Sequence, residues 1–204
     1  MKIRTMHAAV LTAGFAFALA AVAQTAAPGP VTSTTVVKSG TPGDKTIDRT
    51  TTLPNGKTAT TDTTITKAAG TRNAETVRTG PNGKTETKDV VTSKDGQNGV
   101  NQKLTVTGPK GGTVTRDTTT TNKHGVHTRA TDTTATGPGG KTVTRDTDVT
   151  RGHGDASMDT TRTGADGKTS STDVTKSPKT VTDTHTTQSG KTTTTTHKRK
   201  KPLQ

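Results

Sequence analysis

The sequence predicts a protein that is either mostly disordered or all-β. The ordered form would be Thr-rich tandem β-hairpins in a thin, extended antiparallel ribbon without a compact core. Three observations lead to this prediction. A motif recurs every 27 to 29 residues, 56 of the 204 residues are Thr, and the chain has no Trp, Tyr or Cys. Both Phe residues lie within the first 20 positions, so the rest of the chain has no aromatic side chain for a core.

Residues 1–23 have the features of a secretory signal peptide. Lys2 and Arg4 supply a positive start, and residues 8–22 form an Ala-rich apolar run. That run is short for a membrane-spanning helix, and it ends in the small-residue pattern Ala21-Val22-Ala23, which is typical of a cleavage site. We therefore expect export to the periplasm or the cell exterior, with no membrane-spanning segment left after cleavage.

Cleavage after Ala23 leaves a strongly basic chain. Its formal charge is +11, because two of the 29 basic residues leave with the signal peptide. We expect residues 24–41 to be a flexible linker, residues 42–196 to hold the tandem repeats, and residues 197–204 to form a basic tail.

Five segments share one template, a turn followed by alternating Thr. They are LPNGKTATTD (53–62), GPNGKTETKD (80–89), GPKGGTVTRD (108–117), GPGGKTVTRD (137–146) and GADGKTSSTD (164–173), with a degenerate sixth copy from residue 188. Asn-Gly, Gly-Gly and Asp-Gly dipeptides accept positive φ and predict tight turns, here with Pro just before the turn. A second Gly midway, such as Gly70 or Gly125, divides each unit into two strands rich in β-branched residues. Each unit is therefore predicted to be a β-hairpin.

Period-two alternation in the strand after each turn predicts two different faces. The candidate repeat face is built from Thr and Asp: Thr58, Thr60, Asp62, Thr85, Thr87, Asp89, Thr113, Thr115, Asp117, Thr142, Thr144 and Asp146. The opposite face is expected to be half apolar and basic, as Val143, Arg145 and Val149 illustrate. We expect Asp to lie near Lys or Arg across strands, each such contact contributing about 0.2–1 kcal/mol.

Disorder is the alternative to this ribbon. Few large aliphatic side chains follow the signal peptide, and neither strand face makes a good core face. Thr and Val also favour extended backbone where no sheet forms.

The sequence points to no catalytic, cofactor or metal site. No Ser lies in a G-x-S-x-G motif, and the His124 and His127 pair has no Cys beside it. The Gly-Lys turns lack the flanking strand and helix of a phosphate-binding loop. We therefore expect a protein that is not an enzyme and that holds no cofactor or metal.

The one concentrated basic cluster lies at the C-terminus. Lys198, Arg199, Lys200 and Lys201 are candidate polyanion-binding residues. Outside the cell the candidate polyanions are lipopolysaccharide, an anionic wall polymer and extracellular DNA, bound through counterion release without sequence-specific recognition. The sequence makes no prediction of oligomeric state.

These features favour an exported, non-enzymatic repeat protein with a structural or surface-interaction role, bound electrostatically to anionic envelope or extracellular polymers. The alternative is a hydrophilic, disordered protectant of the cell envelope against stress or desiccation. A third hypothesis, a fibre subunit that pairs through sheet edges, ranks last because Lys, Arg, Asp and Pro recur as gatekeepers against such pairing.

Overall fold

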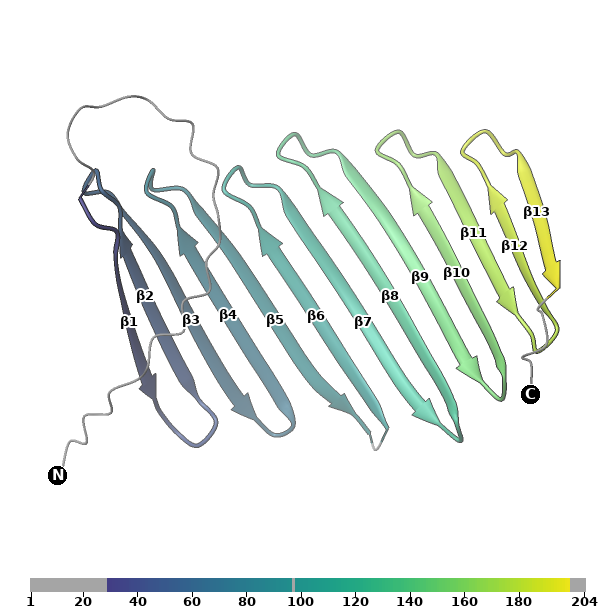
Figure 1. The fold of residues 1–204 in the computed structure, drawn as a ribbon, viewed down its shortest axis with the longest axis horizontal. Helices are drawn as coiled ribbons and strands as arrows, with labels where there is room; N and C mark the ends of the chain where they lie inside the picture. The colour runs from purple at the N-terminus through teal and green to yellow at the C-terminus, as the bar shows by residue number, and fades with distance from the viewer. Residues whose placement is uncertain (1–28, 97, 199–204) are drawn as a thin grey trace.

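The computed structural model describes residues 29–96 and 98–198, and these form one antiparallel sheet of thirteen strands (Figure 1). Each strand pairs with its neighbours in the chain, so the spatial order is the chain order. The strands are β1 (Thr32–Ser39), β2 (Lys45–Thr52), β3 (Thr58–Ala68), β4 (Thr71–Thr79), β5 (Thr85–Asp95), β6 (Gly99–Thr107), β7 (Thr113–Lys123), β8 (Val126–Thr136), β9 (Thr142–Gly152), β10 (Asp155–Thr163), β11 (Thr169–Lys176), β12 (Thr180–Thr186) and β13 (Thr192–Lys198).

The all-β prediction is confirmed, and the disordered alternative is wrong for the described residues. Residues 32–39, predicted to belong to a flexible linker, form β1, because the sequence TSTTVVKS is rich in β-branched residues that fit a strand. The last residue of β13, Lys198, comes from the predicted basic tail. The predicted signal peptide and residues 199–204 of that tail lie outside the described residues.

Six loops at the upper edge in Figure 1 share one geometry. In the first, the N–H of Leu53 donates to the carbonyl of Lys57 at 2.8 Å, and the N–H of Gly56 donates to the carbonyl of Leu53 at 2.9 Å. The loops that start at residues 80, 108, 137, 164 and 187 repeat both bonds, and the Gly in the third loop position has φ between 74° and 82° in all six. This is a type I turn closed by a glycine bulge, a three-residue hairpin loop.

In four of the six loops Pro lies inside the loop and not before it, which corrects the shorter turns expected from the sequence. Pro54 is the first of the three loop residues, where its fixed φ fits a type I turn. The side chain of Asn55 then accepts a hydrogen bond from the N–H of Lys57 at 3.1 Å. The template thus encodes the whole loop, from Pro to Lys.

At the opposite edge three loops contain two residues each. Ala69-Gly70, His124-Gly125 and His153-Gly154 all have positive φ at both positions, as a type I′ turn requires. These turns match the twist of the strands that they join and set the pairing register of each hairpin.

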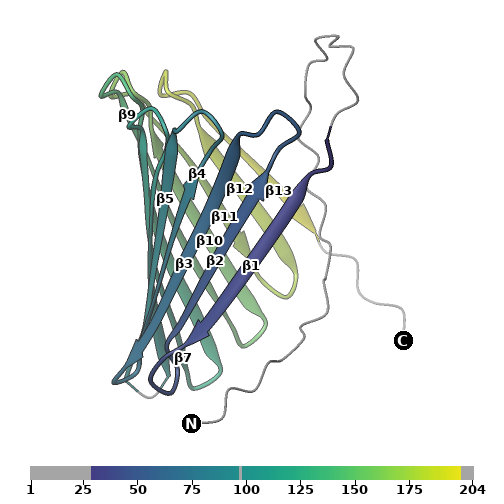
Figure 2. The same cartoon turned by 90° about the vertical axis from the view of Figure 1, so that its left-hand side faces the viewer.

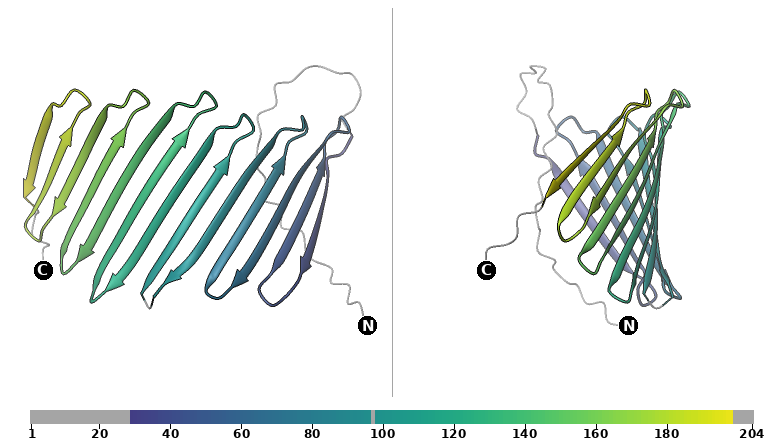
Figure 3. Two further views of the ribbon diagram at one scale, coloured as in Figure 1. Left: turned by 180° about the vertical axis from the view of Figure 1, so that it is seen from behind. Right: turned by 90° about the vertical axis from the view of Figure 1, so that its right-hand side faces the viewer.

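The sheet is a single, bowed layer. Figure 2 and the right-hand view of Figure 3 show the middle strands on one side and both edge strands, β1 and β13, curving towards the other. No hydrophobic side chain of the described residues is buried, and the most enclosed polar side chain is Thr118, which is 8% exposed. Backbone ladders and Thr pairs across strands hold the layer together; the hydroxyls of Thr63 and Thr76, for example, lie 3.2 Å apart.

Candidate functional site

The register keeps each side of the sheet consistent from β1 to β13. Residues that pair across strands point to the same side, so the pairs define two faces. We name them the acidic face and the basic face after the charged side chains that their strands carry.

The acidic face carries twelve carboxylates and four lysines on its strands. The carboxylates belong to Asp48, Asp62, Glu75, Asp89, Asp95, Asp117, Asp132, Asp146, Asp148, Asp155, Asp159 and Asp173, and the lysines are Lys38, Lys103, Lys123 and Lys198.

The basic face carries thirteen cations and two carboxylates on its strands. The cations are Lys45, Arg49, Lys67, Arg72, Arg78, Lys88, Lys94, Arg116, Arg129, Arg145, Arg151, Arg162 and Lys176, and the carboxylates are Glu86 and Asp183.

Most large aliphatic residues of the strands also lie on the basic face. They are Val37, Ile47, Ile65, Val90, Val100, Leu104, Val106, Val114, Val143, Val149, Met158, Val174 and Val181, against Val36, Val77, Val91 and Val126 on the acidic face. The basic face is therefore amphipathic: methyl groups alternate with long cationic side chains whose stems are themselves apolar.

Like charges lie opposite one another at several places across the strands, and the expected Asp–Lys contacts are few: Lys103 lies opposite Asp117, and Lys38 forms an ion pair with Asp48 at 3.9 Å. Asp and Arg alternate along a strand and so point to opposite sides, and only two ion pairs form among the described residues. Asp117, Asp132 and Asp146 make one continuous row on the acidic face, and Arg145 lies opposite Arg162 on the basic face. Like charges placed directly opposite destabilise a sheet, so this arrangement costs stability.

A second row of carboxylates perturbs the titration of its middle member. Asp159 on β10 lies between Asp148 on β9 and Asp173 on β11. Partial desolvation and the two neighbouring carboxylates raise the pKa of Asp159 above its ordinary value, and a hydrogen bond with Asp173 adds to the rise. The acidic face is therefore a region of concentrated negative charge.

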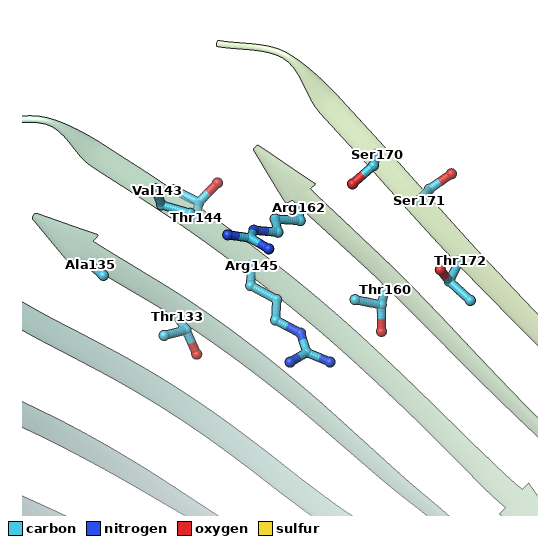
Figure 4. A pocket seen from close by; sticks show the side chains of 10 residues that line it. All are labelled: Thr133, Ala135, Val143, Thr144, Arg145, Thr160, Arg162, Ser170, Ser171 and Thr172. Carbon is cyan, nitrogen blue, oxygen red and sulfur yellow. The ribbon is translucent and has the colours of Figure 1, made fainter. Parts of the chain in front are cut away.

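Three shallow hollows lie mainly on the basic face, which is thus the concave face of the bowed sheet. The first, about 370 Å³, is lined by Arg145 and Arg162 among Thr, Ser, Ala and Val side chains, and in Figure 4 Arg162 reaches from β10 towards β9. The second, about 570 Å³, is lined by Lys67, Arg72 and Lys94.

The third hollow, about 550 Å³, is lined by Arg162 together with Lys168 and His185. Lys168 belongs to one of the six upper-edge loops, so loop lysines extend the cationic surface to that edge. Every one of the three hollows contains at least two cationic side chains, and none contains a carboxylate. Their chemistry suits anionic groups.

All twelve residues of the predicted repeat face lie on the acidic face: Thr58, Thr60, Asp62, Thr85, Thr87, Asp89, Thr113, Thr115, Asp117, Thr142, Thr144 and Asp146. Of the predicted tail cluster, Lys198 is an exposed residue at the end of β13, and Arg199, Lys200 and Lys201 lie outside the described residues. Of the predicted repeat face, only Thr144 also lines one of the three hollows.

The cations of the basic face are absent from both predicted sites, although the sequence carries a signal for them. Lys88, Arg116 and Arg145 each come immediately before the recurrent Asp of the template. Alternation assigns such a neighbour to the opposite side of the sheet. What the sequence of one strand does not contain is the register that joins these positions into a single surface.

No helix in the described part of the chain is long and apolar enough to cross a membrane. Within residues 29–96 and 98–198, no cluster of three or more His, Asp or Glu side chains is arranged to hold a metal ion. Comparison of the chain with family models, curated proteins and solved structures finds no match.

Proposed function

We propose that the chain is an exported, non-enzymatic repeat protein that binds anionic polymers of the cell envelope or the extracellular space. The polymer lies along the basic face. The single observation that carries the proposal is the separation of charge between the two faces, with thirteen cations on the strands of one side and twelve carboxylates on the other.

The spacing of the cations suits a polymer better than a small anion. They occur on strands from β2 to β11, and neighbouring strands are about 4.8 Å apart. A linear polyanion that crosses the strands would meet a cation on most of the strands that it passes. Contacts of this kind release counterions, so binding weakens steeply as salt concentration rises.

The makeup of the basic face also argues against recognition of a base sequence. After residue 20 the chain has no Phe, Tyr or Trp on which a base can stack, and Thr and aliphatic side chains make up most of the surface between the cations. Phosphate, sulfate and carboxylate groups are therefore equivalent ligands, and lipopolysaccharide, anionic wall polymers and DNA belong to one ligand class.

Transposing adjacent charges tests whether the face, and not the net charge, binds the polymer. The variant combines Lys88→Asp with Asp89→Lys, Arg116→Asp with Asp117→Arg, and Arg145→Asp with Asp146→Arg. Composition and net charge stay the same, but three cations leave the basic face. With mixed-sequence duplex DNA we expect weaker binding and a plot of log K against log salt that is shallower by about three units.

A matched control moves the same cations along their own face. It combines Lys88→Val with Val90→Lys, Arg116→Val with Val114→Arg, and Arg145→Val with Val143→Arg. We expect DNA affinity within about twofold of the unaltered chain, because the charge of each face is unchanged. Equal binding by the transposed variant and this control would contradict the proposal.

Deleting residues 198–201 tests the predicted tail cluster separately. If the basic face carries the binding, the deletion lowers the DNA affinity of the unaltered chain and of the transposed variant by the same factor. The difference between these two chains then stays the same. Loss of all binding at low salt on deletion of the tail alone would instead assign the polymer to the tail. Lipopolysaccharide in place of DNA should give the same ranking of variants.

A further inference from the structure

The basic and acidic faces are complementary to each other in charge and shape. One is concave, cationic and rich in donors; the other is its convex counterpart and rich in carboxylates. We propose that a second copy of this chain stacks its basic face on the acidic face of the first, and that repetition of this contact builds an open-ended stack. The proposal goes beyond polymer binding and needs no polymer.

Elimination of the other layer arrangements supports this contact. Two basic faces together would bury the aliphatic side chains but would confront thirteen cations with thirteen more. Two acidic faces together would confront twelve carboxylates with twelve. Only the acidic-on-basic arrangement brings two faces of predominantly opposite charge together, and it also covers the aliphatic residues, among which Val37 is 52% exposed in the single sheet.

Shape and area support the same contact. All copies have the same curvature, so the convex side of one sheet fits the concave side of the next. Thirteen strands about 4.8 Å apart and about 30 Å long give a face of roughly 1,700 Å², well above the roughly 800 Å² per partner of a standard stable interface.

The contact is heterologous, because it joins two different surfaces of the same chain. Such a contact leaves one basic face and one acidic face free at the ends of every assembly, so growth does not close. A polyanion on the basic face would occupy the same surface and would therefore cap the stack at that end.

Two complementary variants test this geometry in the chain of residues 24–204, which retains all thirteen strands. The first neutralises the basic face: Arg116→Gln, Arg129→Gln, Arg145→Gln and Arg162→Gln. The second neutralises the acidic face: Asp117→Asn, Asp132→Asn, Asp146→Asn and Asp159→Asn. Circular dichroism confirms that each variant retains the sheet, and sedimentation velocity at low salt, without polymer, measures assembly.

The unaltered chain is expected to form species whose size grows with concentration and which dissociate in 0.5 M salt. Each variant alone should associate roughly a hundredfold more weakly, since four charge contacts are lost. An equimolar mixture should give a one-to-one dimer and nothing larger, because each variant retains one functional face. A monomeric unaltered chain at low salt, a salt-insensitive dimer, or a mixture that does not associate would overturn the stacking contact and would leave polymer binding to be judged by the DNA measurements.

Discussion

Threonine supplies both the backbone preference and the cross-strand links of this sheet. Its β-branched side chain favours extended backbone, and its hydroxyl pairs with a partner hydroxyl on the next strand. Thr136 and Thr142 are linked in this way at 3.0 Å, and Thr184 and Thr194 at 3.2 Å. Because these hydroxyl pairs are solvated, each contributes little to the free energy of unfolding. A change at a single turn or strand-end residue therefore has a measurable effect on stability.

Ala69 is the least suitable residue in a two-residue turn. It has φ of 43°, a left-handed conformation that disfavours a Cβ, whereas Asn adopts it readily and Asn-Gly is the preferred type I′ pair. Ala69→Asn is expected to raise the free energy of unfolding by about 0.5–1 kcal/mol, measured by denaturant titration. Ala68→Asn, one residue earlier in β3, provides the control. An equal gain at both positions would contradict the turn-based explanation.

Gly152 lies where β9 meets the turn between β7 and β8, and a side chain has no room there. A Cβ at this position would lie 2.9 Å from Cγ2 of Val126 and 3.1 Å from the carbonyl oxygen of Gly125. Gly152→Ala is expected to destabilise the sheet by about 1–3 kcal/mol. At Gly139 a Cβ would meet nothing within 4 Å, so Gly139→Ala should change stability by less than about 0.5 kcal/mol. Thermal melts of the two variants compare them directly.

Asp159 makes part of the stability depend on pH. Because its pKa is raised in the folded state, the folded state holds this proton more tightly than the unfolded chain does. Ionised Asp159 therefore lowers the free energy of unfolding by its full amount at neutral pH. This loss of stability disappears as the pH falls from the raised pKa of Asp159 to the ordinary carboxyl pKa.

Asp159→Asn removes this loss of stability at every pH. The variant is expected to be more stable than the unaltered chain at pH 7 and equal to it below the ordinary carboxyl pKa. Denaturant titrations across this range measure the difference. A constant difference at all pH values would indicate a packing effect unrelated to ionisation.

The hairpin is the unit at the next scale, and its contacts are confined to adjacent strands. The six upper-edge loops share one geometry, and the face assignment continues through every strand pair, so removal of a whole unit leaves matching ends. Deleting residues 108–136 removes β7 and β8 and joins Thr107 to Gly137. The upper-edge loop at residues 137–141 then connects β6 to β9 with both faces aligned.

A deletion shorter by one residue provides a strict comparison. Removing residues 108–135 takes away the same charges, but Thr136 then separates Thr107 from the loop and pairs with Thr142. Every side chain beyond the loop moves to the other face relative to the strands before it. We expect the 108–136 deletion to melt cooperatively within a few degrees of the full chain and to bind DNA, and the 108–135 deletion to lose DNA affinity. Similar affinities would show that coherent faces are not required.

The elements were predictable from the sequence to different degrees. The Gly of the template marks every upper-edge loop, and Thr-Val alternation marks the strands, because both signals are local. β1 was not predicted, since it precedes the first template and lies in the stretch that was assigned to a linker. The opposition of Asp117 to Asp132, and of Arg145 to Arg162, depends on the length of each loop. It therefore lies in the pairing of strands and not in the pattern of any single strand.

The whole molecule is one layer in which each strand contacts only its neighbours in the chain. Such an arrangement has low contact order and frays from its ends. Amide hydrogen exchange is expected to be slowest in the central strands β6 to β9 and fastest in β1 and β13. Uniform protection across all strands would indicate that the edges are covered, as they would be in a larger assembly.

The odd number of strands determines how the two edges of the sheet could pair with another copy. Because thirteen is odd, β1 and β13 run in the same direction. A copy translated sideways would meet its neighbour through a parallel junction, unlike the twelve antiparallel junctions within the chain. If both copies keep their cationic sides facing the same way, an antiparallel seam forms only between like edges, β1 with β1 or β13 with β13, related by a two-fold axis perpendicular to the sheet. That rotation keeps both cationic sides facing the same way, so a lateral pair would present one continuous concave surface twice as wide.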